Sequence, residues 1–207
     1  MLREVLLLLA FIFTVSSCST DENNNLNSSL KYNIIEPGNG IYAIIEKNVN
    51  KSKTENKNFE TVYYQDDKIL KIERYNTAGI LTDEFDVAAV TVFEYNTQGN
   101  VKYLKYFDKN GNHSEDEVFG YWSIEYVYDE QNRVRMEIYR DKDSKFLEVP
   151  RDNSGNIAKL NFLSPILTYE YSDDTLIIKA LDENFNLLKE VYGDKPCVPF
   201  IDCGENN

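Results

Sequence analysis

Histidine, tryptophan and methionine are scarce in this chain of 207 residues, which holds one, one and two of them respectively. The single histidine, His113, lies in Asn-Gly-Asn-His-Ser, a sequence typical of a solvated turn. A Ser-His-Asp triad would have only this residue to serve as its base. The scarcity of histidine therefore argues against triad hydrolysis, and it also argues against a metal site built on soft ligands.

Positive charge is also in short supply. The 22 Lys and Arg residues are outnumbered by 35 Asp and Glu, which gives a formal net charge of -13 at pH 7. Phosphate contacts need clustered Lys and Arg, so this balance disfavours a general nucleic-acid binder. It equally disfavours attachment to anionic lipid by charge alone. With 42% hydrophobic residues the chain can still bury a core, which argues against full disorder.

The longest hydrophobic run stands at the amino terminus, from Val5 to Val15. Its 11 residues are too few for a membrane-spanning helix, which needs about 20. Arg3 precedes the run, and the small residues Ser16 and Ser17 follow it. This order is typical of a secretory signal peptide.

The sequence Val15-Ser16-Ser17-Cys18 resembles the lipobox of bacterial lipoprotein signal peptides. The resemblance implies cleavage before Cys18, thioether lipidation of its sulfur and palmitate on the mature end. An ordinary secretory peptide with an incidental cysteine is the alternative. Ser19 stands where inner-membrane lipoproteins carry aspartate, so the outer membrane is the expected location, with the side of the membrane left open.

Only three cysteines are present, and Cys197 and Cys203 remain once Cys18 carries lipid. An exported compartment permits a disulfide between them, and closing so short a loop would stabilise the fold by roughly 2 kcal/mol. Their spacing is not the Cys-x-x-Cys of redox motifs. We expect a disulfide, and we expect neither a cofactor nor a bound metal.

The remainder of the chain is an internal repeat. Residues 93–111 align with residues 126–144 without a gap at an offset of 33. Two further copies with small gaps cover residues 63–79 and 169–185, and a degenerate turn lies at residues 152–156. Each copy has the pattern of strand, turn, strand, turn.

Each repeat turn begins with Asp or Asn and carries Gly three residues later. The Asx side chain bonds the backbone of its own turn, and glycine tolerates the left-handed conformation that closes it. Asn132 is the best substitute for that glycine, whereas Ser144 and Phe185 depart from the pattern. The turn glycines are Gly79, Gly99, Gly111 and Gly155.

Between the turns, apolar and polar residues alternate with a period of two, as in residues 122–128. The next strand is predicted to place Val134, Met136 and Ile138 on the face opposite Glu137. No segment after the signal peptide sustains a helical period. We therefore predict an all-β fold, in which serial antiparallel hairpins form one long twisted sheet or a partly closed roll after an N-terminal signal helix.

Two repeat units, Tyr95-Asn96-Thr-Gln-Gly99-Asn100 and Tyr128-Asp129-Glu-Gln-Asn132-Arg133, resemble the YD repeats of RHS-type exported proteins and of small repeat lipoproteins. The resemblance covers residues 60 to 190 and implies β-hairpin shells or extended sheets that carry no catalysis themselves. Fold alone does not determine activity. The predicted division is a signal peptide at 1–17, a tether at 18–29, a repeat domain at 30–193 with an exposed polar loop at 48–58, and a tail at 194–207.

Aromatic residues are the remaining signal, with 15 Tyr and 11 Phe. Exported sheets can present such side chains as stacking platforms for sugars or as protein-contact anchors, although plain cross-strand ladders would also use them. The candidate binding aromatics are Tyr106, Tyr121, Trp122 and Tyr139.

The sequence therefore predicts a lipoprotein of the outer membrane with a non-catalytic binding or scaffolding role through a Tyr-rich β face. Its expected partners are the membrane, through lipid on Cys18, and an envelope protein or glycan, but not nucleic acid. A carbohydrate-active or other hydrolase with paired carboxylates is the alternative.

Overall fold

The computed structural model describes residues 28–37, 42–83, 87–115, 120–157, 164–172 and 175–193. Lipidation of Cys18 and the disulfide between Cys197 and Cys203 concern residues outside these ranges. The elements are β1 (Ser28–Glu36), β2 (Ala43–Val49), the 3-10 helix η1 (Lys51–Thr54), β3 (Phe59–Gln65), β4 (Lys68–Tyr75), β5 (Val90–Tyr95), β6 (Val101–Phe107), β7 (Ser123–Tyr128), β8 (Val134–Arg140), β9 (Ile166–Tyr171), β10 (Leu176–Leu181) and β11 (Leu187–Gly193).

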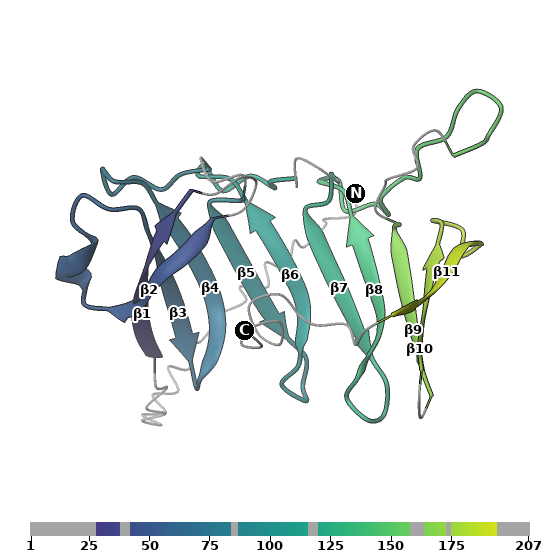
Figure 1. The fold of residues 1–207 in the computed structure, drawn as a ribbon, viewed down its shortest axis with the longest axis horizontal. Coiled ribbons are helices and arrows are strands. Elements are labelled where there is room, and N and C mark those ends of the chain that lie inside the picture. Colours follow the sequence, from purple (N-terminus) through teal and green to yellow (C-terminus); the bar gives the residue numbers. More distant parts are fainter. Residues whose placement is uncertain are drawn as a thin grey trace, which may run out of the picture.

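All eleven strands belong to one antiparallel sheet with the order β11-β10-β9-β8-β7-β6-β5-β4-β3-β1-β2. From β3 to β11 each strand lies beside the next one in the chain, while β1 pairs with both β2 and β3. The sheet does not close, so β2 and β11 are its two edges (Figure 1). The predicted all-β fold of serial antiparallel hairpins is confirmed.

From β3 to β10, pairing is long within a hairpin and short between hairpins. Strands β7 and β8 pair from Ser123↔Arg140 to Tyr128↔Val134. Strands β6 and β7, which join two hairpins, pair only from Tyr103↔Glu125 to Lys105↔Ser123. The turn ends of neighbouring hairpins are therefore not joined by backbone hydrogen bonds.

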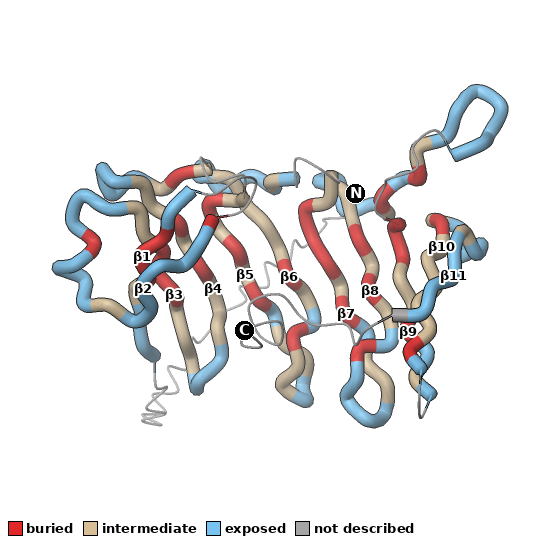
Figure 2. The backbone as a smooth tube through the Cα atoms, viewed as in Figure 1, coloured by how far each residue is buried: buried red, intermediate tan, exposed pale blue. Residues whose placement is uncertain are grey.

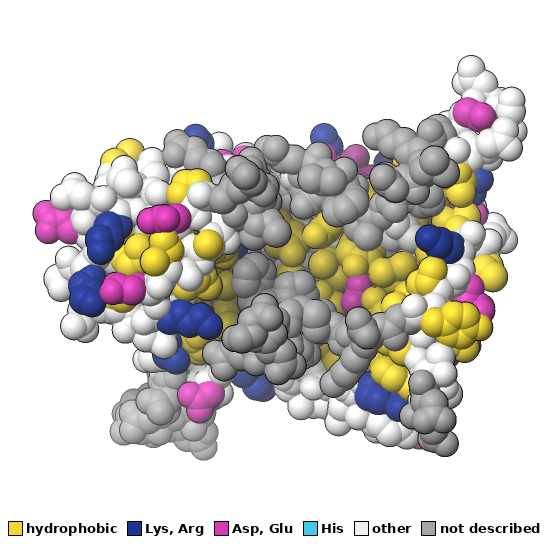
Figure 3. All heavy atoms as spheres, viewed as in Figure 1, with side chains coloured by type: hydrophobic (Ala, Val, Ile, Leu, Met, Phe, Trp, Pro, Cys, Tyr) yellow, Lys and Arg dark blue, Asp and Glu magenta, His cyan; other side chains and the backbone are white. Residues whose placement is uncertain are grey.

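One face of the sheet carries the core. Its buried members include Val62, Ile72, Phe93, Leu104, Ile124, Tyr126, Val134, Tyr139 and Tyr169. Buried residues lie along the middles of the strands (Figure 2), and hydrophobic side chains gather over the middle strands on the face seen in Figure 3. We call this the core face and the opposite one the outer face.

The predicted face assignment for β8 is confirmed for Met136 and Ile138, which lie opposite Glu137, and is wrong for Val134. Val134, Glu137 and Tyr139 are all buried, and Glu137 lies directly opposite the core residue Tyr126. A register shift beside Tyr128↔Val134 leaves Arg135 as an extra residue, and one extra residue moves every later side chain to the other face. Met136 and Ile138 therefore alternate with Glu137, and the core face receives a carboxylate.

The repeat turns share one backbone geometry. In the turn that starts at Asp108, the Gly111 N–H donates to Asp108 O at 3.0 Å, and Asp108 Oδ1 accepts from two backbone N–H groups at 2.8 Å. Gly111 has φ +82°, and Ser144 and Phe185 each have φ 64° at the equivalent positions. These two departures from the sequence pattern thus keep the left-handed turn.

Candidate functional site

Three tyrosines join neighbouring hairpins near the turns that connect the two strands of each hairpin. The hydroxyls of Tyr95, Tyr128 and Tyr171 donate to the carbonyl oxygens of Ile69, Val101 and Val134 at 2.8, 2.7 and 2.7 Å. These bonds fall where backbone pairing between hairpins has stopped, so each hydroxyl satisfies a carbonyl that lacks a strand partner there. We call the three residues the tyrosine latches. They explain why tyrosine precedes the first turn in three of the four repeat copies.

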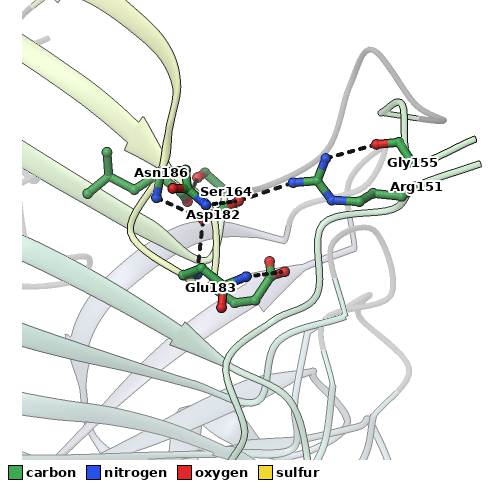
Figure 4. Close-up of polar contacts among 8 residues, drawn as sticks. Arg151, Gly155, Ser164, Asp182, Glu183 and Asn186 are labelled. Atoms are coloured by element: carbon green, nitrogen blue, oxygen red, sulfur yellow. Dashed lines mark hydrogen bonds and ion pairs between the residues drawn. The ribbon is translucent and has the colours of Figure 1, made fainter.

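At the opposite ends of the strands, polar side chains join successive turns. Asp83 Oδ1 accepts from Lys109 N at 3.1 Å, and Glu115 Oε1 accepts from Lys142 N at 3.1 Å. The Arg151 guanidinium donates to Gly155 O and to Asp182 Oδ2, both at 3.1 Å (Figure 4). Contacts between repeat units therefore occur at both ends of the strands.

Three of the four candidate aromatics lie together. The ring centroids of Tyr106 and Tyr121 are 5.8 Å apart, and those of Tyr121 and Tyr139 are 5.2 Å apart. Trp122 is separate, because its ring stacks on His113 at 3.7 Å. His113 Nδ1 also lies 2.7 Å from Lys142 O, so the single histidine has packing and hydrogen-bonding roles between turns.

Tyr139 also contacts a buried carboxylate, that of Glu137. Tyr139 and Tyr169 donate hydrogen bonds to Glu137, which is 6% exposed. Burial raises the pKa of Glu137 although these two bonds lower it. Burial and the nearby Glu137 carboxylate raise the pKa of Tyr126 as well. Within the described ranges no Lys, Arg or His forms an ion pair with Glu137.

A second buried glutamate, Glu60, has a different environment. Asn33 Nδ2 donates to Glu60 Oε1 at 2.7 Å, and the Tyr42 hydroxyl donates to Oε2 at 2.9 Å. The Arg74 guanidinium donates to the Tyr42 oxygen at 3.1 Å and to Thr91 Oγ1 at 3.0 Å. Burial raises the pKa of Tyr42 to about 12. One acid and one base are thus bridged by a hydroxyl.

These two glutamates do not form a catalytic pair. Glu60 lies on β3 and Glu137 on β8, five strand spacings apart in the sheet order, which is about 24 Å along the sheet. Paired carboxylates of glycoside hydrolases are roughly 5–9.5 Å apart. The predicted hydrolase alternative therefore gains no support from this pair of glutamates.

A cleft of about 570 Å³ lies on the outer face near the start of the chain. Four aromatic side chains line it, those of Tyr32, Phe59, Tyr63 and Tyr75. Phe59 and Tyr75 are cross-strand partners, and their rings stack with centroids 4.8 Å apart and an interplanar angle of 11°. Its remaining lining residues come from β1, from β3, from the segment of η1 to Asn56 and from the turn at residues 77–79. We call it the aromatic cleft.

Glu73 fixes two of these rings. The hydroxyls of Tyr63 and Tyr75 both donate to Glu73 Oε2 at 2.6 Å, and Lys71 Nζ donates to Oε1 at 2.7 Å. Partial burial would raise the pKa of Glu73, but these three bonds lower it overall. Burial and the bond to Glu73 raise the pKa of Tyr63 to about 12. The rings are therefore held in place before any ligand arrives.

Sequence reasoning missed the aromatic cleft. Residues 48–58, expected as an exposed polar loop, are mostly exposed but contain η1 and the buried Thr54. Thr54 Oγ1 donates to Lys51 O at 2.8 Å. The alternation of Phe59, Thr61 and Tyr63 was the available signal, yet it does not reveal that η1 lies beside the same face.

Two further features bear on function. In the part of the chain that the structure describes, no helix has the length and apolar character needed to cross a membrane. The same residues contain no group of three or more His, Cys, Asp or Glu side chains arranged to hold a metal ion. No protein family model and no curated protein matches the chain in sequence.

Proposed function

We propose that this protein is a lipid-anchored protein of the outer membrane that binds a neutral saccharide in the aromatic cleft, without converting it chemically. The observation that supports this proposal is the cleft itself, with four partly exposed rings of which two are fixed by Glu73. Ordered aromatic rings lose little conformational entropy on binding, which favours affinity.

The size and chemistry of the cleft suit a sugar. Its volume lies within the range of roughly 300–1,000 Å³ that is usual for small-molecule sites. Aromatic faces can pack on the apolar side of a sugar ring, while Lys51, Asn56 and Thr77 can bond its hydroxyls. The net charge of -13 repels polyanions, so a neutral saccharide is favoured over an acidic one.

Calorimetric titration of the full chain in detergent with a panel of neutral oligosaccharides tests this function. Tyr75→Ala should weaken binding at least about tenfold, because truncation of an aromatic anchor commonly costs more than ~1.4 kcal/mol. Tyr75→Phe, which retains the ring, should weaken it much less. Tyr192→Ala is the matched control, since Tyr192 is 71% exposed on the edge strand β11.

Absence of saccharide binding, or equal losses for the variants of Tyr75 and Tyr192, would contradict the cleft as the site. Turnover of a saccharide that single Asp or Glu substitutions abolish would instead favour the hydrolase alternative.

The anchor is tested separately at Cys18. In the lipoprotein proposal, Cys18→Ser should leave the membrane fraction and the detergent phase, because each buried lipid methylene contributes about 0.8 kcal/mol. A Cys18→Ser protein that still partitions into detergent would show that lipid on Cys18 is not the anchor. Cys203→Ser is the control, since it alters a cysteine outside the lipobox.

A further inference from the structure

Basic residues are concentrated at one end of this acidic protein. Residues 28–75 hold eight Lys and Arg against seven Asp and Glu, whereas residues 76–193 hold 12 against 22. Four of the eight, Lys47, Lys51, Lys53 and Lys57, fall within 11 consecutive residues around η1, and all four are exposed. The net charge of the whole chain therefore does not describe the end of the sheet formed by β2 and η1.

The ammonium groups of this segment are available to a partner. Lys51 and Lys57 form no ion pair with any residue that the structure describes. Lys53 Nζ lies 3.5 Å from Glu46 Oε1, but the two side chains are 57% and 47% exposed. An ion pair that is solvated to this extent is weak. It does not prevent Lys53 from binding an anion.

Two exposed isoleucines lie on β2 beside these lysines. Ile44 and Ile45 are 39% and 51% exposed. Because Ile34 pairs with Glu46 and Ile35 pairs with Ile44, Ile45 is the extra residue of a bulge in the edge strand. On the face seen in Figure 3, Lys and Arg side chains lie beside hydrophobic ones at this end, with a few acidic side chains among them. Aliphatic side chains flanked by lysines are typical of surfaces that bind a membrane interface.

The proposed lipid anchor attaches at the same end of the sheet. Ser28, the first residue of β1, stands ten residues after Cys18, and ten extended residues span at most about 36 Å. Strand β1 pairs with β2 and lies beside η1. A lipid on Cys18 would therefore hold the lysines and isoleucines close to the bilayer, where a tethered surface needs only a weak attraction to stay bound.

We infer that Ile44, Ile45 and the lysines of residues 47–57 contact an anionic phospholipid surface, so that the protein stands on the membrane with the β2 end of its sheet. This inference rests on the proposed lipid anchor. The ammonium groups lie among the lipid phosphates, and the isoleucines enter the headgroup region. The acidic remainder of the sheet is repelled by the same surface, which keeps the later hairpins away from it. An acidic polypeptide would also attract the lysines, but the anchor keeps the lipid surface within constant reach.

Quenching of tryptophan emission by brominated lipid tests the contact. The lipidated protein with Ile45→Trp is reconstituted into vesicles of brominated phosphatidylcholine, either alone or in equal parts with phosphatidylglycerol. Trp122 is 6% exposed and supplies a background that lipid does not reach. The added tryptophan should be quenched at least about twofold more in the anionic vesicles. Leu187→Trp is the matched control, because Leu187 is 57% exposed on the opposite edge strand β11 and should show no such difference.

Equal quenching of the two variants, or no quenching of Ile45→Trp in anionic vesicles, would overturn the inference. Flotation with vesicles of phosphatidylcholine alone reports the anchor separately, since a neutral bilayer offers the lysines no charge. A protein that does not float contradicts the anchor, and both proposals fall. A protein that floats while Ile45→Trp stays unquenched keeps the anchor and contradicts only the inference.

Lysine variants test whether charge selects the anionic lipid. Combined replacement of Lys47, Lys53 and Lys57 by Gln in the Ile45→Trp protein should abolish the difference between anionic and neutral vesicles. High salt should have the same effect on the protein with its lysines intact. Lys51 is left in place because it lines the aromatic cleft. A difference that persists in this variant and in high salt would overturn the inference.

A charge-matched variant supplies the control. Replacement of the exposed Lys109, Lys142 and Lys145 by Gln removes the same charge from turns of later hairpins and should leave the quenching of Ile45→Trp unchanged. Equal loss in both triple variants would show that only the net charge matters and would overturn the inference. If soluble polyglutamate binds the lysines of residues 47–57 while no vesicle quenches Ile45→Trp, the partner is an acidic polypeptide and the inference is wrong.

Discussion

The two buried glutamates of the core face occupy contrasting surroundings. Glu60 shares a network with Arg74, so the charges of an acid and a base balance through the Tyr42 hydroxyl. Glu137 is hydrogen-bonded by Tyr139 and Tyr169 and forms no ion pair with any residue of the described part of the chain. Glu60 therefore has a basic partner in its network, whereas the carboxyl group of Glu137 is hydrogen-bonded by two tyrosine hydroxyls.

The contrast shows that equal burial does not mean equal energetic roles. A buried ion has its desolvation cost offset only while its partner remains, so removal of one partner is strongly destabilising. An unpaired buried carboxylate instead favours its neutral form. Substitutions at the two glutamate clusters should therefore differ both in size and in their dependence on pH.

Arg74→Met should have the largest effect. It removes the base and leaves the Glu60 carboxylate, 2% exposed, without a compensating charge, which typically costs about 3–5 kcal/mol. The free energy of unfolding is measured by denaturant titration. The double substitution Glu60→Gln and Arg74→Met should recover much of the loss, and failure to recover would show that Arg74 contributes mainly by packing.

Glu137→Gln should change the free energy of unfolding by less than Arg74→Met does, and the difference from wild type should depend on pH. Because burial raises the pKa of Glu137 above its ordinary 4.5, the folded state binds this proton more tightly than the unfolded state. Its contribution is complete below pH 4.5 and is lost as the pH rises toward the raised value, by at most about 1.4 kcal/mol per pH unit. The difference in unfolding free energy between wild type and Glu137→Gln, measured from pH 4 upward, should therefore move in favour of the variant.

A difference that stays constant with pH would show that Glu137 has the same proton affinity in both states. The comparison of the two clusters would then fail, because Glu137 would behave as a compensated group.

Gly111→Val should give the smallest loss of stability, in the turn that starts at Asp108. Gly111 has φ +82° and open space around its missing side chain, so Val should lose about 1–2 kcal/mol through backbone strain alone. Gly111→Asn should lose much less, because Asn132 already adopts φ 59° at the equivalent position. Thermal unfolding measures both changes, and equal losses would refute the turn explanation.

Much of the fold could be predicted because the sequence patterns that specify strands and turns are local. The alternation in residues 122–128 and the Asx-x-x-Gly turns depend on neighbouring residues, so strands and turns could be predicted. The face of Glu137 could not, because the extra residue Arg135 is a property of pairing with another strand. The sequence therefore placed Glu137 away from Val134, although both are buried.

The candidate site was less accessible to sequence reasoning. Tyr106, Tyr121 and Tyr139 were chosen for their type, and the structure brings their rings together, with Tyr139 donating to the buried Glu137. The aromatic cleft depends on η1 lying beside β1, β3 and β4, an arrangement of segments that periodicity does not encode.

The short pairing between hairpins has a consequence for cooperativity. From β3 to β10 each hairpin is paired over more ladder positions within itself than to the next hairpin, so the sheet approximates a one-dimensional array of units that are coupled to their nearest neighbours by a few ladder positions, side-chain hydrogen bonds and the shared core. Native-state hydrogen exchange should then show amides opening in hairpin-sized groups rather than strand by strand. The same nearest-neighbour coupling allows a hairpin to be gained or lost by recombination while its neighbours keep their own registers.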